Sequence, residues 1–204
     1  MTCSDVRTLV RDYLNEATAD LWTNDTLNRL INEEIRSLAR KNIYLEEIHT
    51  VSTVVDQFDY TLPSGTVKVE KVEKNVGTSS KPDWQEWTGW DNYAGALYLR
   101  SRPTTAWTLR IHIKKKFTEL SDDTTATDIP DEKVEVLVWG TVVKAYKALM
   151  GYFVDAKNWD SVAKPDGIGM SQVQNWLIQA KAEYRELVNL YRTVSRPRDI
   201  NLTG

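Results

Sequence analysis

Hydrophobic positions near the start of the chain recur at helical spacing. The pattern predicts one helix from Ser4 to Glu16, with Ser4 as its cap, and a second from Asn24 to Lys41. The second helix is the most clearly marked. Thr23 is a good N-cap for it, and its apolar residues recur three or four positions apart, as one buried face requires: Leu27, Leu30, Ile31, Ile35 and Leu38.

In the middle of the chain the apolar residues recur at every second position, as they do in a β-strand. Residues 48–55 are rich in β-branched side chains, and Asp56 with Gln57 then suggests a hairpin turn. A further strand is indicated around 67–72, where the alternation slips by one residue. Gly, Ser and Pro mark a loop at 76–83. Two more strands, near 96–100 and 107–114, complete a small antiparallel β unit.

Helical spacing returns after an acidic loop. The run 134–139 has the composition of a strand. Pro130 and the acidic residues after it nevertheless suit the first turn of a helix, which we expect to reach Met150. Ser171 with Gln174 indicates a capping box for a last helix. That helix should end near Val194, because the proline at 197 cannot continue it.

The predicted fold class is α+β: about four helices in a bundle, with the antiparallel β unit inserted between the two helix pairs. Neither pair can bury its apolar stripe alone, so the pairs are expected to pack together. The domains that follow are a helical bundle from 1–44 and 128–194, a β insertion at 45–120, and a C-terminal tail at 195–204.

Charge and composition narrow the class of function. The 204 residues carry a net charge of -3, which argues against broad binding of nucleic acid phosphates. The single cysteine allows no internal disulfide, and no run approaches the ~18 apolar residues of a membrane helix. We therefore expect a protein made in a cytoplasm. Eight Trp and nine Tyr against three Phe are typical of a chain that makes interfaces.

No residue pattern indicates an enzyme, a metal site or a cofactor site. His49 and His112 fall in predicted strands, and with Cys3 they are too few for a common zinc site. Cys3 lies near a helix N-terminus, which can lower a thiol pKa, but a passive terminal cysteine is the favoured interpretation.

Three other features have both a chemical and a structural interpretation, and the structural one is favoured for each. The acidic cluster between Asp122 and Glu132 resembles a weak cation site but lacks the pattern of a calcium loop. Gly167 and Gly169 lack the third glycine of a phosphate cradle. The run Lys114 to Lys116 suits either phosphate or a solvated strand end.

Three tryptophans lie close together in the middle of the chain. Trp84, Trp87 and Trp90 are suited to stacking bases or sugar rings if they are exposed on a loop. They are equally suited to covering the β unit or to contacting a neighbouring subunit.

Several motifs occur in an order that resembles the head-to-tail connector (adaptor) proteins of tailed bacteriophages. They are Leu21-Trp22-Thr23-Asn24-Asp25 with Leu30-Ile31-Asn32-Glu33, then Phe58-Asp59-Tyr60-Thr61-Leu62-Pro63, then Ile129-Pro130-Asp131-Glu132 with Ala145-Tyr146. The sequence departs from the pattern at Glu34, where alanine is common, and over 84–90.

The resemblance implies a structural protein of the virion neck. Such adaptors form a ring of about twelve copies on the portal protein, extend the DNA channel and dock the next neck or tail protein. DNA passes through without specific binding. By the same resemblance, the portal contact falls on Tyr191, Arg196, Pro197, Arg198, Ile200 and Leu202.

The sequence is also compatible with two other functions. One is a binding module in which the three tryptophans take single-stranded nucleic acid or glycan. The other is a different virion protein, such as a stopper or tail-completion factor, which differs from an adaptor in its partner.

Overall fold

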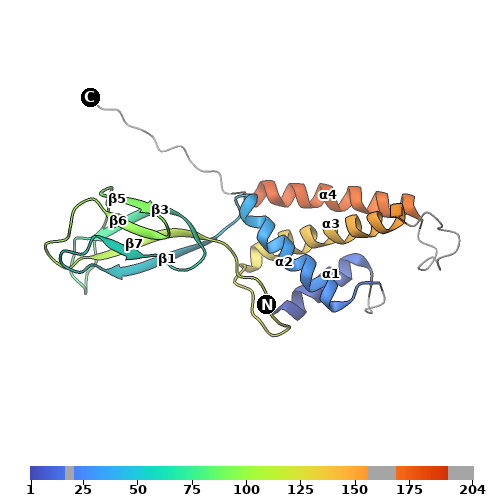
Figure 1. The fold of residues 1–204 in the computed structure, drawn as a ribbon, viewed down its shortest axis with the longest axis horizontal. Helices are drawn as coiled ribbons and strands as arrows, with labels where there is room; N and C mark the ends of the chain where they lie inside the picture. The colour runs from blue at the N-terminus through green and yellow to red at the C-terminus, as the bar shows by residue number, and fades with distance from the viewer. Residues whose placement is uncertain (17–20, 156–168, 193–204) are drawn as a thin grey trace, which may run out of the picture. The chain divides into compact units, whose positions relative to one another are not determined.

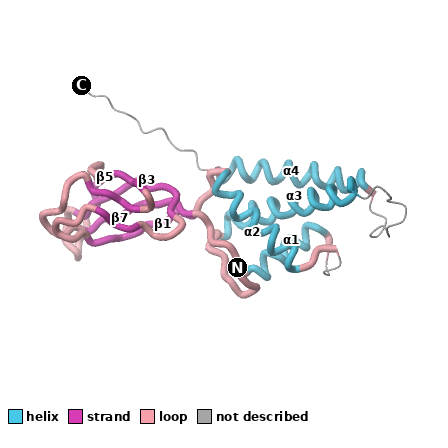
Figure 2. The backbone as a smooth tube through the Cα atoms, in the orientation of Figure 1, coloured by secondary structure: helices cyan, strands magenta, loops and turns pink. Residues whose placement is uncertain are grey.

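The structure is a computed structural model that describes residues 1–16, 21–155 and 169–192 (Figure 1). The chain divides into two compact units. One joins Met1–Ile43 to the residues from Glu119 onward, and the other is Tyr44–Thr118. Among the described residues, the first unit holds the helices and the second holds the strands (Figure 2).

The helical unit has four helices in its described part. They are α1 (Cys3–Leu14), α2 (Asn24–Arg40), α3 (Asp131–Asp155) and α4 (Met170–Tyr191). α3 contacts all three others, and α4 runs alongside it (Figure 1). The apolar stripe predicted for α2 is buried, and α2 packs against α3, whose buried residues include Val134, Leu137, Val138 and Val142.

The helix ends differ in detail from the sequence predictions. Thr23 caps α2 as expected, accepting a hydrogen bond from the Thr26 N–H. α1 instead begins after Thr2, which forms a reciprocal capping box with Asp5, so Ser4 lies inside the helix. The capping box predicted at Ser171 is wrong, because α4 starts after Gly169 and the serine already belongs to its first turn.

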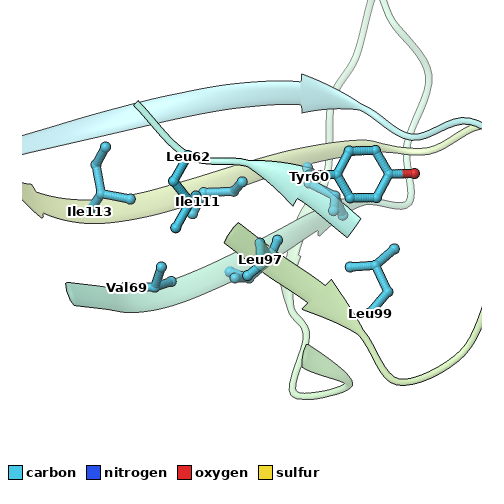
Figure 3. Packing of buried hydrophobic residues seen from close by; sticks show 9 residues of the cluster. Tyr60, Leu62, Val69, Leu97, Leu99, Ile111 and Ile113 are labelled. Carbon is cyan, nitrogen blue, oxygen red and sulfur yellow. The ribbon is translucent and has the colours of Figure 1, made fainter. Parts of the chain in front are cut away.

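The β unit contains seven strands in two antiparallel sheets. They are β1 (Leu45–Ser52), β2 (Asp59–Thr61), β3 (Thr66–Asn75), β4 (Trp84–Glu86), β5 (Trp90–Tyr93), β6 (Ala96–Leu99) and β7 (Thr108–Lys115). One sheet has the order β1-β7-β3-β4 and the other β2-β6-β5. The two sheets share a core that Figure 3 shows, built from Tyr60, Leu62, Val69, Val72, Leu97, Leu99, Leu109, Ile111 and Ile113.

Strand pairing corrects one prediction and confirms another. Asp56 does turn the chain, with a positive φ of 64°, but the turn does not close a hairpin. β1 pairs with β7, and β2 pairs with β6 in the other sheet. The slip in alternation predicted near Val69 is a register shift between Val69 and Lys71.

The predicted fold class is confirmed: four helices in the described residues, with the strands of antiparallel sheets between the two helix pairs in the order of the chain. The stretch 84–90, which the sequence left unassigned, forms β4 and the start of β5. α3 runs five residues beyond the predicted end at Met150. The predicted tail, 195–204, lies outside the described residues.

Residues 119–128, called the strap below, fasten the chain to the helical unit before α3 begins. Three side chains one helical turn apart along α2 hold it. Arg36 pairs with Glu119 at 2.5 Å, and Asn32 exchanges two hydrogen bonds with the Leu120 backbone at 2.8 and 2.9 Å. Asn28 bonds Arg7, whose guanidinium also binds Asp123 through both nitrogens.

The acidic residues of the strap are therefore engaged by the protein itself. The Asp122 carboxylate accepts hydrogen bonds from Thr124 and Thr125, which lower its pKa to about 2, and Asp123 faces Arg7. Over residues 1–16, 21–155 and 169–192, no group of side chains is arranged to hold a metal ion. Asp122 and Asp123 thus stabilise the strap and its contact with α1.

Candidate docking surface

The last turn of α4 is rich in apolar side chains but poorly buried. In its first half, Val173, Leu177 and Ala180 are buried, and Trp176 contacts the Tyr146 ring at 5.9 Å between centroids. Beyond Tyr184, α4 has no fully buried side chain. Three large apolar residues are half-buried and a fourth, Leu190, is 70% exposed; the half-buried three are Leu187, Val188 and Tyr191. We call residues 187–191 the α4 end.

A buried carboxylate fixes α4 just before this apolar end. Glu34 of α2 is 1% exposed, and its Oε1 accepts a short hydrogen bond from the Tyr184 hydroxyl. Lys41 approaches the same oxygen at 3.0 Å, and Lys144 of α3 lies 3.6 Å from Oε2. The carboxylate thus connects α2, α3 and α4 where apolar packing of α4 stops.

The Tyr184 side chain is itself held from two sides. The Lys41 ammonium lies 4.9 Å from the centroid of its ring, a cation–π distance. Burial and the neighbouring Glu34 carboxylate both raise the pKa of Tyr184, so its hydroxyl remains a hydrogen-bond donor. These contacts hold α4 against the helical unit immediately before the α4 end.

Only one of the predicted portal-binding residues lies in the described part of the chain. Tyr191 is half-buried in the last turn of α4, and the helix closes with a hydrogen bond from the Arg192 N–H to Val188 O at 2.9 Å. The other predicted residues lie outside the described residues: Arg196, Pro197, Arg198, Ile200 and Leu202. The predicted contact residues do not include Leu187, Val188 and Leu190, although the apolar character of these residues at the end of a helix is visible in the sequence.

The three tryptophans are half-buried, and each is packed on the β unit. Trp87 and Trp90 lie against the core between the sheets, and Trp87 meets Trp107 edge-on at 5.7 Å. The Trp84 ring is covered by the Arg110 guanidinium at 3.9 Å. Its indole N–H is buried without a hydrogen-bond partner among the described residues. These contacts support the covering role and leave a contact to a neighbouring subunit as a prediction.

The remaining candidate groups have structural roles. His112 bonds Glu73 at 2.8 Å, and Cys3 is buried with its thiol donating to Asn28. Burial raises the pKa of the Cys3 thiol, which contradicts the lower pKa that its place near a helix N-terminus suggested. Lys114 is not at a solvated strand end, because it is buried and pairs with Glu70 at 3.2 Å. Gly169 precedes α4, and Gly167 lies outside the described residues.

None of the helices in the described ranges, 1–16, 21–155 and 169–192, combines the length and the apolar character of a membrane span.

Comparison with known proteins gives a family for almost the whole chain. The family model described as "SU10 adaptor protein" matches residues 1–198. No curated protein matches the chain. Among solved structures, one described as "Neck of empty GTA particle computed with C6 symmetry" is 11% identical, over 97% of this chain and 92% of that one. Its TM-score of 0.33 is too low to support any argument about this protein.

Proposed function

The chain belongs to the SU10 adaptor protein family, and from that premise we propose that it forms a ring on the portal protein in the neck of a tailed phage. The ring extends the DNA channel and presents a docking surface to the next neck or tail protein. The observation that carries the proposal is the α4 end, where Leu190 is 70% exposed in an apolar turn that leads into the last residues of the chain.

The α4 end has the character of a surface that is covered in an assembly. Its large apolar side chains would otherwise face water, which is unfavourable by about 25 cal/mol for each Å² of apolar surface. Its partner would be the portal protein, contacted through Tyr191 and then Arg196, Pro197, Arg198, Ile200 and Leu202.

Ring formation and the passage of DNA are consistent with the rest of the chain. A closed ring needs two different side surfaces on each copy, and exposed apolar residues occur in both units, among them Phe58, Tyr93 and Leu21. A net charge of -3 suits a channel that DNA crosses without being retained. The proposed role involves no catalysis and no cofactor, and it places the protein in the virion neck.

Binding of purified chain to purified portal protein tests the proposal. Deletion of residues 193–204, or Leu190→Asp, should weaken portal binding by about tenfold or more. Ile178→Asp is the matched control, because Ile178 is 64% exposed on the same helix but lies outside the α4 end. Circular dichroism would confirm that each variant is folded. Wild-type binding by both the truncated chain and Leu190→Asp would overturn the assignment of this surface.

A further inference from the structure

β1 is a long edge strand with an open side. It is the outermost strand of the four-stranded sheet, and its eight residues pair with β7 on one side only. In the described residues no other segment pairs with its second side. Every other edge strand of the two sheets is shorter: β4 and β2 have three residues each and β5 has four.

This edge lacks most of the features that keep edge strands apart. Natural sheets blunt their edges with short strands, charged side chains (lysine above all), proline or bulges. Leu45–Ser52 contains no lysine and no proline, its carboxylates are Glu46 and Glu47, and its pairing with β7 runs without a register shift. In the middle of the strand, Ile48 is 54% exposed. Such an edge is a template for another strand unless a partner covers it.

The backbone hydrogen bonds show which residues of β1 point to the open side. The Thr53 N–H donates to Trp107 O at 2.7 Å, in line with the register of β1 on β7. Residues alternate in direction along an antiparallel strand, so odd-numbered residues of β1 face β7. The even-numbered ones therefore direct their N–H and C=O groups to the open edge: Glu46, Ile48, Thr50 and Ser52.

The sequence of β1 is complementary to itself in one antiparallel register. Hydrogen-bonded pairs must join even-numbered residues of both strands, which limits the possible registers. Centring the pair on Ile48 places it against the partner's Ile48 and puts Glu46 opposite the partner's Thr50. On the other face Glu47, which pairs with its own Lys115, lies opposite the partner's His49.

The neighbouring registers are less favourable. A shift in one direction places Glu47 opposite the partner's Glu47, and like charges directly opposed are destabilising. A shift in the other direction places Ile48 opposite the partner's Thr50 and His49 opposite the partner's His49. The central register alone matches apolar with apolar and acid with imidazole, and it also joins Leu45 with the partner's Val51.

We propose that the open edge of β1 binds β1 of a second copy of this chain, antiparallel and centred on Ile48. The contact joins the two sheets across a twofold axis through three hydrogen-bonded residue pairs, which is about six main-chain hydrogen bonds. A twofold contact cannot connect neighbours in a ring whose copies all face one way. The paired state is therefore that of the free chain, and it protects the edge before assembly. This inference does not depend on the portal contact.

Sedimentation velocity over about 1 to 200 μM would measure the dimer, because its population rises with concentration. Ile48→Pro should weaken dimerisation by about tenfold or more. The N–H that it removes points to the open edge, so the pairing with β7 is retained. Circular dichroism and the Tm would confirm folding. A wild-type chain that stays monomeric throughout this range, or a dimer that Ile48→Pro leaves unchanged, would overturn the proposal.

Cysteine cross-linking tests the register independently. In a Cys3→Ser background, Ile48→Cys should give a disulfide-linked dimer, because paired Cα atoms in this position lie about 5.5 Å apart. Thr50→Cys is the matched control. It points to the same edge, but in this register it lies about four residues from its counterpart, roughly 13 Å away. Cross-linking of Thr50→Cys in preference to Ile48→Cys would contradict the proposed pairing.

Discussion

The Glu34 carboxylate and the backbone of Gly140 are packed in direct contact. A Cβ atom added at Gly140 would lie 2.5 Å from Glu34 Cδ and 2.7 Å from its Oε1. The carboxylate has little freedom to move away, because Lys41, Lys144 and Tyr184 hold it from three sides. A helical glycine thus makes room for a buried acid between α2 and α3.

Gly140→Ala should destabilise the protein although alanine favours helix. The helix propensity gain is about 1 kcal/mol, whereas overpacking a filled site costs about 1–3 kcal/mol. Gly151→Ala is the control in the same helix, since a Cβ there meets nothing within 4 Å, and it should stabilise the protein. Denaturant unfolding of both variants measures the difference. Equal effects of the two substitutions would show that the contact with Glu34 is unimportant.

Replacing Glu34 should restore part of the stability that Gly140→Ala removes. Glu34→Ala/Gly140→Ala is expected to be more stable than the sum of the two single changes predicts, with a coupling of about 1–3 kcal/mol. Lys41 and Lys144 retain 28% and 26% side-chain exposure, so both ammonium groups can turn to water once the acid is gone. Additive effects in the double-mutant cycle would argue against the coupling.

Tyr184→Phe should reduce stability by about 1–3 kcal/mol at neutral pH, because a buried carboxylate loses a hydrogen-bond donor. Burial raises the pKa of Tyr184 in the folded chain, whereas the unfolded tyrosine ionises near pH 10. The stabilisation is therefore present below pH 10 and is lost as the pH rises further. Urea unfolding at increasing pH should show that the difference in free energy of unfolding between wild type and Tyr184→Phe becomes smaller. A difference that stays constant from pH 8 to 11 would contradict this.

Acid should loosen the strap. Hydrogen bonds from Thr124 lower the pKa of Asp122 to about 2, and the hydrogen bond from Arg7 lowers the pKa of Asp123. A carboxyl whose pKa is lower in the folded state stabilises above its ordinary pKa near 4 and loses that effect as the pH falls toward 2. Asp122→Asn should lower the Tm at pH 7 and flatten its decline between pH 4 and 2. Asp83→Asn, on the exposed loop 76–83, is the control.

The tryptophans should not respond to nucleic acid or glycan. Trp87 and Trp90 lie against the core, and Arg110 covers the ring of Trp84, so stacking with a ligand would require these contacts to break. Fluorescence titration with single-stranded oligonucleotides and with oligosaccharides measures this directly. A saturable change that Arg110→Ala enhances would favour the binding module over the adaptor.

The helices and most strands could be predicted because the spacing of apolar residues along a segment shows whether it is helical or extended. The Trp-rich stretch could not, because β4 and β5 are only three and four residues long and have few alternating positions. The sequence also could not show which strands pair. The turn at Asp56 is a local feature, whereas the pairing of β1 with β7 joins residues about sixty positions apart. Glu34 appeared only as a departure from a family pattern, since its compensation by Gly140 and Tyr184 requires the fold.

Quantitative mass spectrometry of purified particles of the source phage, counting this chain against the portal protein, tests whether the chain is a neck adaptor. A neck ring should give a ratio near one to one, which means about a dozen copies in each particle. Absence of the chain from purified particles would contradict its assignment as a neck adaptor.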